Sequence, residues 1–151
     1  MLRARLNEDL KVAVKAKDQI AVSTLRLILA ALKDRDIAAR GKGNADGVSE
    51  EEILELLQKM VRQRRESIEA YEQAGRQELA EREAGEIEVI KRFLPTPLKD
   101  SEVESAVEQA IVEVEASSIK DMGRVISSLK ERYAGRMDFA KASQMVKQRL
   151  A

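Results

Sequence analysis

Cysteine and histidine are both absent from the 151-residue chain. Without cysteine there are no disulfides and no thiol nucleophiles, and without histidine there is no imidazole base. The two absences also remove the usual zinc ligands, so a zinc site is not expected. A chain free of cysteine fits a reducing compartment, and we expect a cytoplasmic protein.

Net charge and long apolar runs are lacking as well. The 27 basic residues are balanced by 27 acidic residues, so the total charge favours neither a nucleic acid nor a membrane as partner. The most apolar stretch, residues 20–32, is interrupted by Ser23, Thr24 and Arg26 and is too short to span a bilayer. Residues 1–17 are too highly charged for a signal peptide. We therefore expect a soluble protein without membrane association.

Motifs for nucleotide chemistry and metal-dependent proteolysis are missing too. The sequence contains no GxxxxGK[ST], no GxGxxG and no HExxH, and no cofactor is predicted. Ser67 has no histidine to activate it, and Tyr71 lies on an apolar helical stripe, which favours a core position. Paired carboxylates such as Glu83 and Glu86 are common in a chain that is 36% charged, so a catalytic role for them is disfavoured.

Proline occurs only at positions 95 and 97, and long segments show apolar residues at a period of 3.6, which predicts an all-α protein. Proline cannot continue a helix, and it restricts the residue before it. The segment Pro95-Thr96-Pro97 is therefore expected to separate two domains. These are an N-terminal multihelical domain over residues 1–94 and a small three-helix domain over residues 95–151.

Capping residues and glycines predict where the helices begin and end. A first helix is expected over residues 2–16, and Asp18 caps a second helix that ends at a glycine-rich loop over residues 40–48. In the C-terminal domain, Ser118 and Asp121 form a predicted cap. The three helices of that domain are expected over residues 101–115, 118–133 and 138–150.

A long helical hairpin is predicted over residues 49–94. Ser49 and Glu52 match a capping box at the start of its first helix. Gly75 is expected to end that helix, and a second helix over residues 77–93 returns along it.

One charged residue, Arg64, lies on the apolar stripe of the hairpin. If the chain turns near Gly75, then Arg64 faces Glu86, and Glu83 lies close by. A cation in an apolar seam is costly unless it is paired, and a guanidinium can bridge two carboxylates. A buried network of Arg64, Glu83 and Glu86 that fixes the hairpin register is therefore favoured over an exposed ligand-binding arginine.

The balanced total charge conceals a segregation within the C-terminal domain. Residues 95–115 hold six acidic residues and one basic residue, whereas residues 116–151 hold eight basic and three acidic residues. The eight are Lys120, Arg124, Lys130, Arg132, Arg136, Lys141, Lys147 and Arg149. Such a segment can bind phosphates without recognising a base sequence. The alternative is a solvated face whose positive charge balances the negative charge of the acidic helix beside it. Aromatic residues are scarce, which disfavours recognition of single strands by base stacking.

Two stretches of the sequence resemble the GatB/YqeY family. They are KMVRQRRESIEAYEQAGRQELAEREAGEIEVIKRFLP (59–95) and DMGRVISSLKERYAGRMDFAKASQMVKQRL (121–150). The resemblance covers nearly the whole chain and is closest to the free-standing YqeY-like proteins. Lys99 departs from the family, which often places a serine or threonine cap there, and Asp100 is expected to cap the helix instead.

The resemblance implies a relation to the C-terminal tail of the B subunit of the tRNA-dependent amidotransferase. That enzyme is a carbon–nitrogen ligase with glutamine as amido donor, and its tail contacts the body of tRNA away from the reacting end. The resemblance therefore adds weight to phosphate contacts by the eight basic residues. Gly123 is costly inside a helix and is expected to permit close approach of another helix, and the resemblance implies that an RNA backbone could approach there equally well. Because the catalytic parts of the amidotransferase are not among these 151 residues, no catalytic residue is carried over.

Three hypotheses about function remain open at this point. The first is a non-catalytic tRNA-binding or accessory module that uses the basic C-terminal helices. The second is a protein-interaction adaptor without RNA binding, which the even total charge and the few aromatic residues favour. The third is a stand-alone, amidotransferase-like enzyme, which the missing motifs disfavour.

Overall fold

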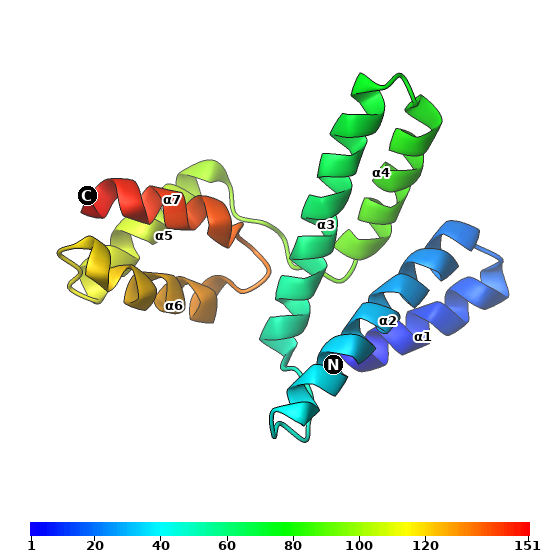
Figure 1. Cartoon of the computed structure of the whole chain (residues 1–151), viewed down its shortest axis with the longest axis horizontal. Helices are drawn as coiled ribbons and strands as arrows, with labels where there is room; N and C mark the ends of the chain where they lie inside the picture. Colours follow the sequence, from blue (N-terminus) through cyan, green and yellow to red (C-terminus); the bar gives the residue numbers. More distant parts are fainter. The chain divides into compact units, whose positions relative to one another are not determined.

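The computed structural model describes residues 1–151 and contains seven α-helices, one 3₁₀ turn and no strand (Figure 1). The all-α prediction is confirmed. The chain divides into two compact units, Met1–Leu94 and Pro95–Ala151. None of the helices combines the length and the apolar composition that a membrane span requires.

The N-terminal unit is built from two antiparallel helical pairs (Figure 1). Helices α1 (Leu2–Ala16) and α2 (Gln19–Gly41) form the first pair, and α3 (Glu50–Gln73) and α4 (Gln77–Lys91) form the second. Helix α2 packs against α4 and, less extensively, against α3. The core between the pairs is aliphatic, and its most deeply buried side chains are Leu6, Leu25, Ile28, Ile53, Leu57 and Ile90.

The helix ends of this unit are set by short local contacts. The Asp18 side chain accepts the Ala21 N–H at 3.1 Å, and Ser49 and Glu52 form the predicted capping box. Gly75 has a φ of +72° at the turn between α3 and α4, a conformation that glycine adopts without steric cost. Helix α2 runs to Gly41, so the loop begins later than predicted, and α4 ends two residues earlier, at Lys91.

Asp36 fixes the loop before α3, a role that the sequence analysis did not foresee. Its carboxylate accepts the buried Val48 N–H at 2.9 Å and forms two hydrogen bonds with the Arg3 guanidinium, which also donates to the Val48 carbonyl at 2.7 Å. Gly47, at a φ of +80°, lies so close to Asp36 that a Cβ there would clash with the carboxylate. The hydrogen bonds from Arg3 are the main reason that the pKa of Asp36 is lowered to about 2.

The C-terminal unit is a three-helix domain in which each helix contacts the other two. The helices are α5 (Asp100–Glu113), α6 (Met122–Tyr133) and α7 (Phe139–Leu150). Val107, Val125, Leu129 and Val146 are the most buried side chains of its core.

Two details at helix starts in this unit correct the sequence analysis. The helix expected from residue 118 begins as a 3₁₀ turn, Ile119–Asp121, before α6 starts at Met122. The Asp121 carboxylate accepts the Ser117 and Ser118 N–H groups at 2.9 and 3.2 Å, which stabilises this tighter turn. Asp100 does not cap α5, because it is the first residue of the helix and Lys99 holds the N-cap position, where its N–H donates to the Glu102 side chain at 3.0 Å.

Candidate functional site

The eight predicted basic residues all lie in the C-terminal unit, but its four arginines are already engaged in polar contacts. Arg132 Nη1 donates to Glu113 Oε1 at 3.1 Å, and Arg149 is paired with Glu108. Both carboxylates belong to α5, so this acidic helix partly neutralises the positive charge of α6 and α7. The hydrogen bond to Glu113 is also the main reason that the pKa of Arg132 is raised.

Two further arginines are held by the connecting segments. Arg124 Nη2 lies 2.9 Å from Asp121 Oδ1, and the pKa of Asp121 is lowered to about 2, first by the Ser117 N–H and then by Arg124. Arg136 is half-buried, and its Nε donates to the Thr96 carbonyl at 2.9 Å. Arg136 therefore holds the segment before α5 in place, whereas Arg124, at 60% side-chain exposure, keeps donors free for a ligand.

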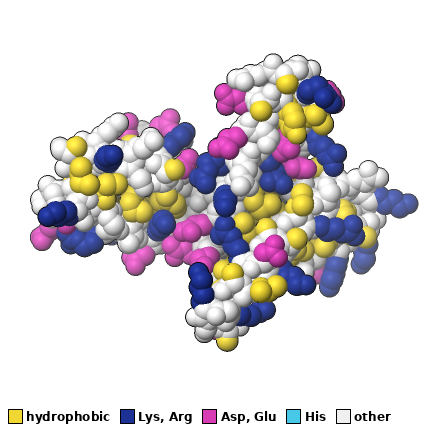
Figure 2. Space-filling view, in the orientation of Figure 1, with side chains coloured by type: hydrophobic (Ala, Val, Ile, Leu, Met, Phe, Trp, Pro, Cys, Tyr) yellow, Lys and Arg dark blue, Asp and Glu magenta, His cyan; other side chains and the backbone are white.

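The lysines of the set are less engaged. The Lys130 ammonium lies 5.9 Å from the centre of the Phe139 ring. Lys120, Lys141 and Lys147 are exposed and form no ion pair with a carboxylate. Lys141 and Lys147 are six residues apart on α7, so they point in directions roughly 120° apart around its axis. On the face of this unit seen in Figure 2, basic and acidic side chains are interspersed.

Gly123 in the first turn of α6 faces open space. A Cβ at this position would meet no atom within 4 Å, so Gly123 serves no close approach to another helix of this chain. Glycine in a helix costs about 1 kcal/mol relative to alanine, and no internal packing offsets that cost here. Arg124 follows Gly123 directly in α6, about 100° further around the helix axis, and Lys120 lies three residues before it, in the preceding 3₁₀ turn.

The second predicted group is Arg64, Glu83 and Glu86 in the α3–α4 hairpin, and its contacts join the two helices of the hairpin. Arg64 Nε donates to Glu86 Oε2 at 2.9 Å, and Arg64 Nη1 donates to the Met60 carbonyl at 3.2 Å. The two side chains are only 13% and 11% exposed. Glu83 forms no hydrogen bond with Arg64, and its pKa is raised, mainly by burial and then by the charge of Glu86. The Arg64 guanidinium is thus occupied by groups of its own hairpin.

No group of three or more acidic side chains in the structure is arranged to hold a metal ion. In the C-terminal unit the structure brings together basic side chains of α6 and α7 and the carboxylates of Glu108, Glu113 and Asp121. The basic side chains that remain exposed there have the chemistry to bind an anion.

Similar proteins include fungal proteins named "Altered inheritance of mitochondria protein 41, mitochondrial". The chain is 35% identical to the one from Lachancea thermotolerans over 117 residues, which is 76% of this chain and 60% of that protein. It is 30% identical to the Kluyveromyces lactis protein over the same coverage, and 35% identical to the Saccharomyces cerevisiae protein over 89 residues. The matched region thus spans about half to three fifths of these relatives.

The names of these relatives contradict the cytoplasmic location expected from the sequence, because each describes a mitochondrial protein. The expectation rested on the absence of cysteine, which indicates a reducing environment and does not identify the compartment.

A family model described as "Yqey-like protein" matches residues 3–150. The match includes both helical pairs of the N-terminal unit and all three helices of the C-terminal unit. The chain therefore belongs to the YqeY-like protein family.

Proposed function

We propose that the protein is a non-catalytic RNA-binding accessory module, in which the start of α6 contacts the phosphate backbone of tRNA. The observation that supports this best is the open glycine at position 123, with the exposed side chains of Lys120 and Arg124 within three residues of it along the chain. A glycine lets a phosphate backbone approach the helix closely, and the two flanking cations attract its charge.

The contacts within the C-terminal unit limit how many basic residues take part. Arg132 and Arg149 would have to leave their carboxylates, and Arg136 is held by the Thr96 carbonyl. That leaves Lys120, Arg124, Lys141 and Lys147 as the available donors. With up to four phosphate contacts, the logarithm of the binding constant should fall with the logarithm of salt concentration at a slope of about −3.

The resemblance to the amidotransferase tail supports RNA as the anion. The resemblance implies that the tail of that relative contacts tRNA and takes no part in the amidotransfer reaction. We propose the same role for this chain, which would bind tRNA and catalyse no step.

The test is a mobility-shift assay with total tRNA at two salt concentrations. The triple variant Lys120→Glu, Lys141→Glu, Lys147→Glu should bind at least about tenfold more weakly than the wild type. The matched control is Lys59→Glu, Arg62→Glu, Arg65→Glu, which makes the same charge change at exposed positions of α3 and should bind almost as well as the wild type. Equal losses in both variants, or no binding by the wild type at about 50 mM salt, would leave the adaptor hypothesis in place.

Gly123→Ala separates RNA contact from stability. Because an added Cβ meets nothing in the protein, the variant should be as stable as the wild type or up to about 1 kcal/mol more stable in thermal unfolding. If the RNA backbone lies against this glycine, the same variant should bind tRNA more weakly. Unchanged binding by a stabilised variant would remove Gly123 from the interface.

A further inference from the structure

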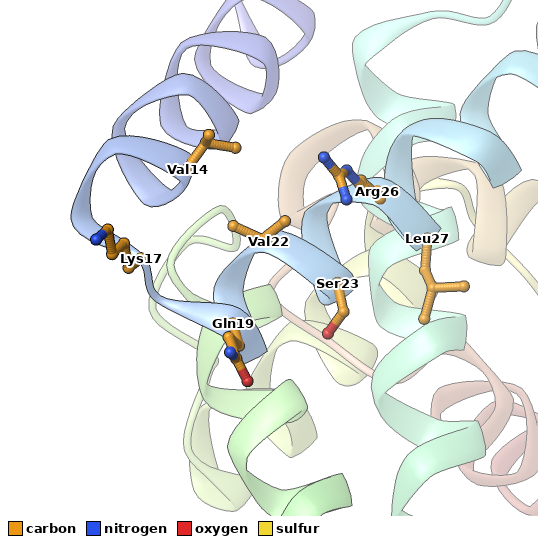
Figure 3. Close-up of a pocket in the computed structure, with 7 residues that line it drawn as sticks. All are labelled: Val14, Lys17, Gln19, Val22, Ser23, Arg26 and Leu27. Carbon is orange, nitrogen blue, oxygen red and sulfur yellow. The ribbon is translucent and has the colours of Figure 1, made fainter.

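An open hollow lies where α1 meets α2, on the opposite unit from the proposed RNA contacts. Its volume is about 750 Å³. Figure 3 labels the residues that line it, from the end of α1 and the first turns of α2: Val14, Lys17, Gln19, Val22, Ser23, Arg26 and Leu27. The walls are mainly aliphatic, and Val14 and Leu27 are 48% and 49% exposed.

Exposed aliphatic side chains are concentrated on these two helices. Five of them lie on α1 and α2: Val12, Val14, Ile20, Leu27 and Ile37. The C-terminal unit has only Val112 and Ile119 at comparable exposure. Two of the five, Val14 and Leu27, line the hollow, and exposed apolar side chains that line a hollow are typical of an interaction site.

The same region has an excess of positive charge. Residues 1–42 contain ten basic and five acidic residues, and Lys and Arg side chains gather over α1 and α2 in Figure 2. At the hollow itself, Lys17 and Arg26 form no ion pair with a carboxylate. The nearest acidic residue along the chain, Asp18, is engaged as the cap of α2 through the Ala21 N–H.

Lys17 occupies a backbone conformation that usually selects glycine. It ends α1 at a φ of 58°, in the left-handed region, where a side chain costs roughly 1 kcal/mol. The chain nevertheless has a lysine here, with an exposed ammonium at the edge of the hollow.

We propose that this hollow binds an amphipathic helix of a partner protein, one whose apolar stripe is flanked by aspartate or glutamate. The ridge of side chains on such a helix fills a hollow, and its flanking carboxylates meet Lys17 and Arg26. A second copy docked by a two-fold axis would oppose these two cations with themselves. A flat lipid surface is not complementary to a hollow, and an RNA backbone would leave the apolar part of the lining, formed by Val14, Val22 and Leu27, without an apolar partner.

The probe is a fluorescein-labelled peptide of roughly 18 residues, with leucine at i, i+3, i+4 and i+7 and glutamate on both flanks of that stripe. Fluorescence anisotropy with the full chain measures its affinity, and amide chemical shifts locate the contact. The wild type should bind it, with shift changes centred on residues 14–27. Val14→Ser with Leu27→Ser should weaken binding at least about tenfold. The matched control, Ile37→Ser, removes an equally exposed side chain elsewhere on α2 and should leave binding unchanged.

A charge exchange sharpens the test. Lys17→Glu with Arg26→Glu should lose the glutamate-flanked peptide and gain an otherwise identical lysine-flanked one, whereas Lys33→Glu with Lys42→Glu should show neither change.

The proposal is overturned if the wild type fails to bind the peptide, or if the control variants weaken binding as much as the hollow variants. It is also overturned if anionic phosphatidylserine vesicles bind the hollow and the peptide does not, or if the hollow mediates a dimer that Leu27→Ser abolishes. The tRNA assay with the α1–α2 variants reports separately on the proposed RNA contacts.

Discussion

Arginine and glutamate are paired across helices in both units, in very different surroundings. In the α3–α4 hairpin, Arg64 and Glu86 are almost enclosed, and a backbone carbonyl satisfies a further donor of the guanidinium. In the C-terminal unit, Arg149 and Glu108 are 36% and 61% exposed. A pair of the first kind fixes the register of two helices, because breaking it leaves a charge without solvent. A pair of the second kind exchanges readily with water and salt, so it contributes little to the stability of the unit.

The largest expected effect comes from breaking the enclosed pair. Arg64→Ala leaves the Glu86 carboxylate nearly buried, with only Arg82 at 4.0 Å to compensate its charge. We expect the free energy of unfolding to fall by about 3 kcal/mol or more, which corresponds to a drop in melting temperature on the order of 10 °C. Thermal unfolding followed by circular dichroism measures this.

The controls for Arg64→Ala lie on the same helix. Arg62 and Arg65 are exposed, so Arg62→Ala and Arg65→Ala should stay close to the wild-type melting temperature. Similar melting temperatures for all three variants would show that the Arg64–Glu86 pair does not stabilise the hairpin.

An intermediate effect is expected at Asp36, together with a pH dependence. Asp36→Asn weakens the contacts to Arg3 and should cost about 2 kcal/mol at neutral pH. Because folding lowers the pKa of Asp36 to about 2, its contribution is complete above pH 4 and is lost as the pH falls from about 4 to 2. Urea unfolding at several pH values should therefore show a flatter acid dependence for Asp36→Asn than for the wild type. Asp34→Asn, at an exposed position of the same helix, should retain the wild-type slope.

The smallest effect is expected for the exposed pair of the C-terminal unit. Arg149→Ala should change the free energy of unfolding by no more than about 1 kcal/mol, because exposed pairs are screened by solvent. The same variant should be less sensitive to added salt than the wild type. A loss as large as that of Arg64→Ala would mean that exposure does not separate the two kinds of pair.

Much of the fold follows from local signals in the sequence. The capping box of Ser49 and Glu52, the glycine at 75 and the period of 3.6 are properties of neighbouring residues, and they predict helices whatever the tertiary structure. The 3₁₀ turn at residues 119–121 was missed because Asp121 caps a 3₁₀ and an α-helical turn with the same hydrogen bonds. Helix ends such as Gly41 and Lys91 depend on packing and lie within the usual uncertainty of one or two residues.

The candidate sites were less predictable, because they depend on partners far away in the sequence. The pairing of Arg132 and Arg149 with α5 requires the three-helix packing, which charge counting does not describe. Asp36 was missed although, like Arg64, it is a charged residue on the apolar stripe of a helix. It follows Ile28 and Leu32 at steps of four residues, so its carboxylate lies on the buried face of α2 and requires a cationic partner. The hollow beside Lys17 gives no local signal, because it forms only where two helices meet.

The contact of Arg136 with the segment before α5 has a consequence in polymer terms. Its hydrogen bond to the Thr96 carbonyl, together with that from the Leu98 N–H to the Arg136 carbonyl, closes a loop that spans 40 residues. Closing a flexible loop of that length costs about 3 kcal/mol of chain entropy, more than two such hydrogen bonds return. Once α5, α6 and α7 have packed, their ends are already close together and most of that cost has disappeared. The residues from Pro95 to Leu98 should therefore become ordered last when this unit folds and be released first when it unfolds.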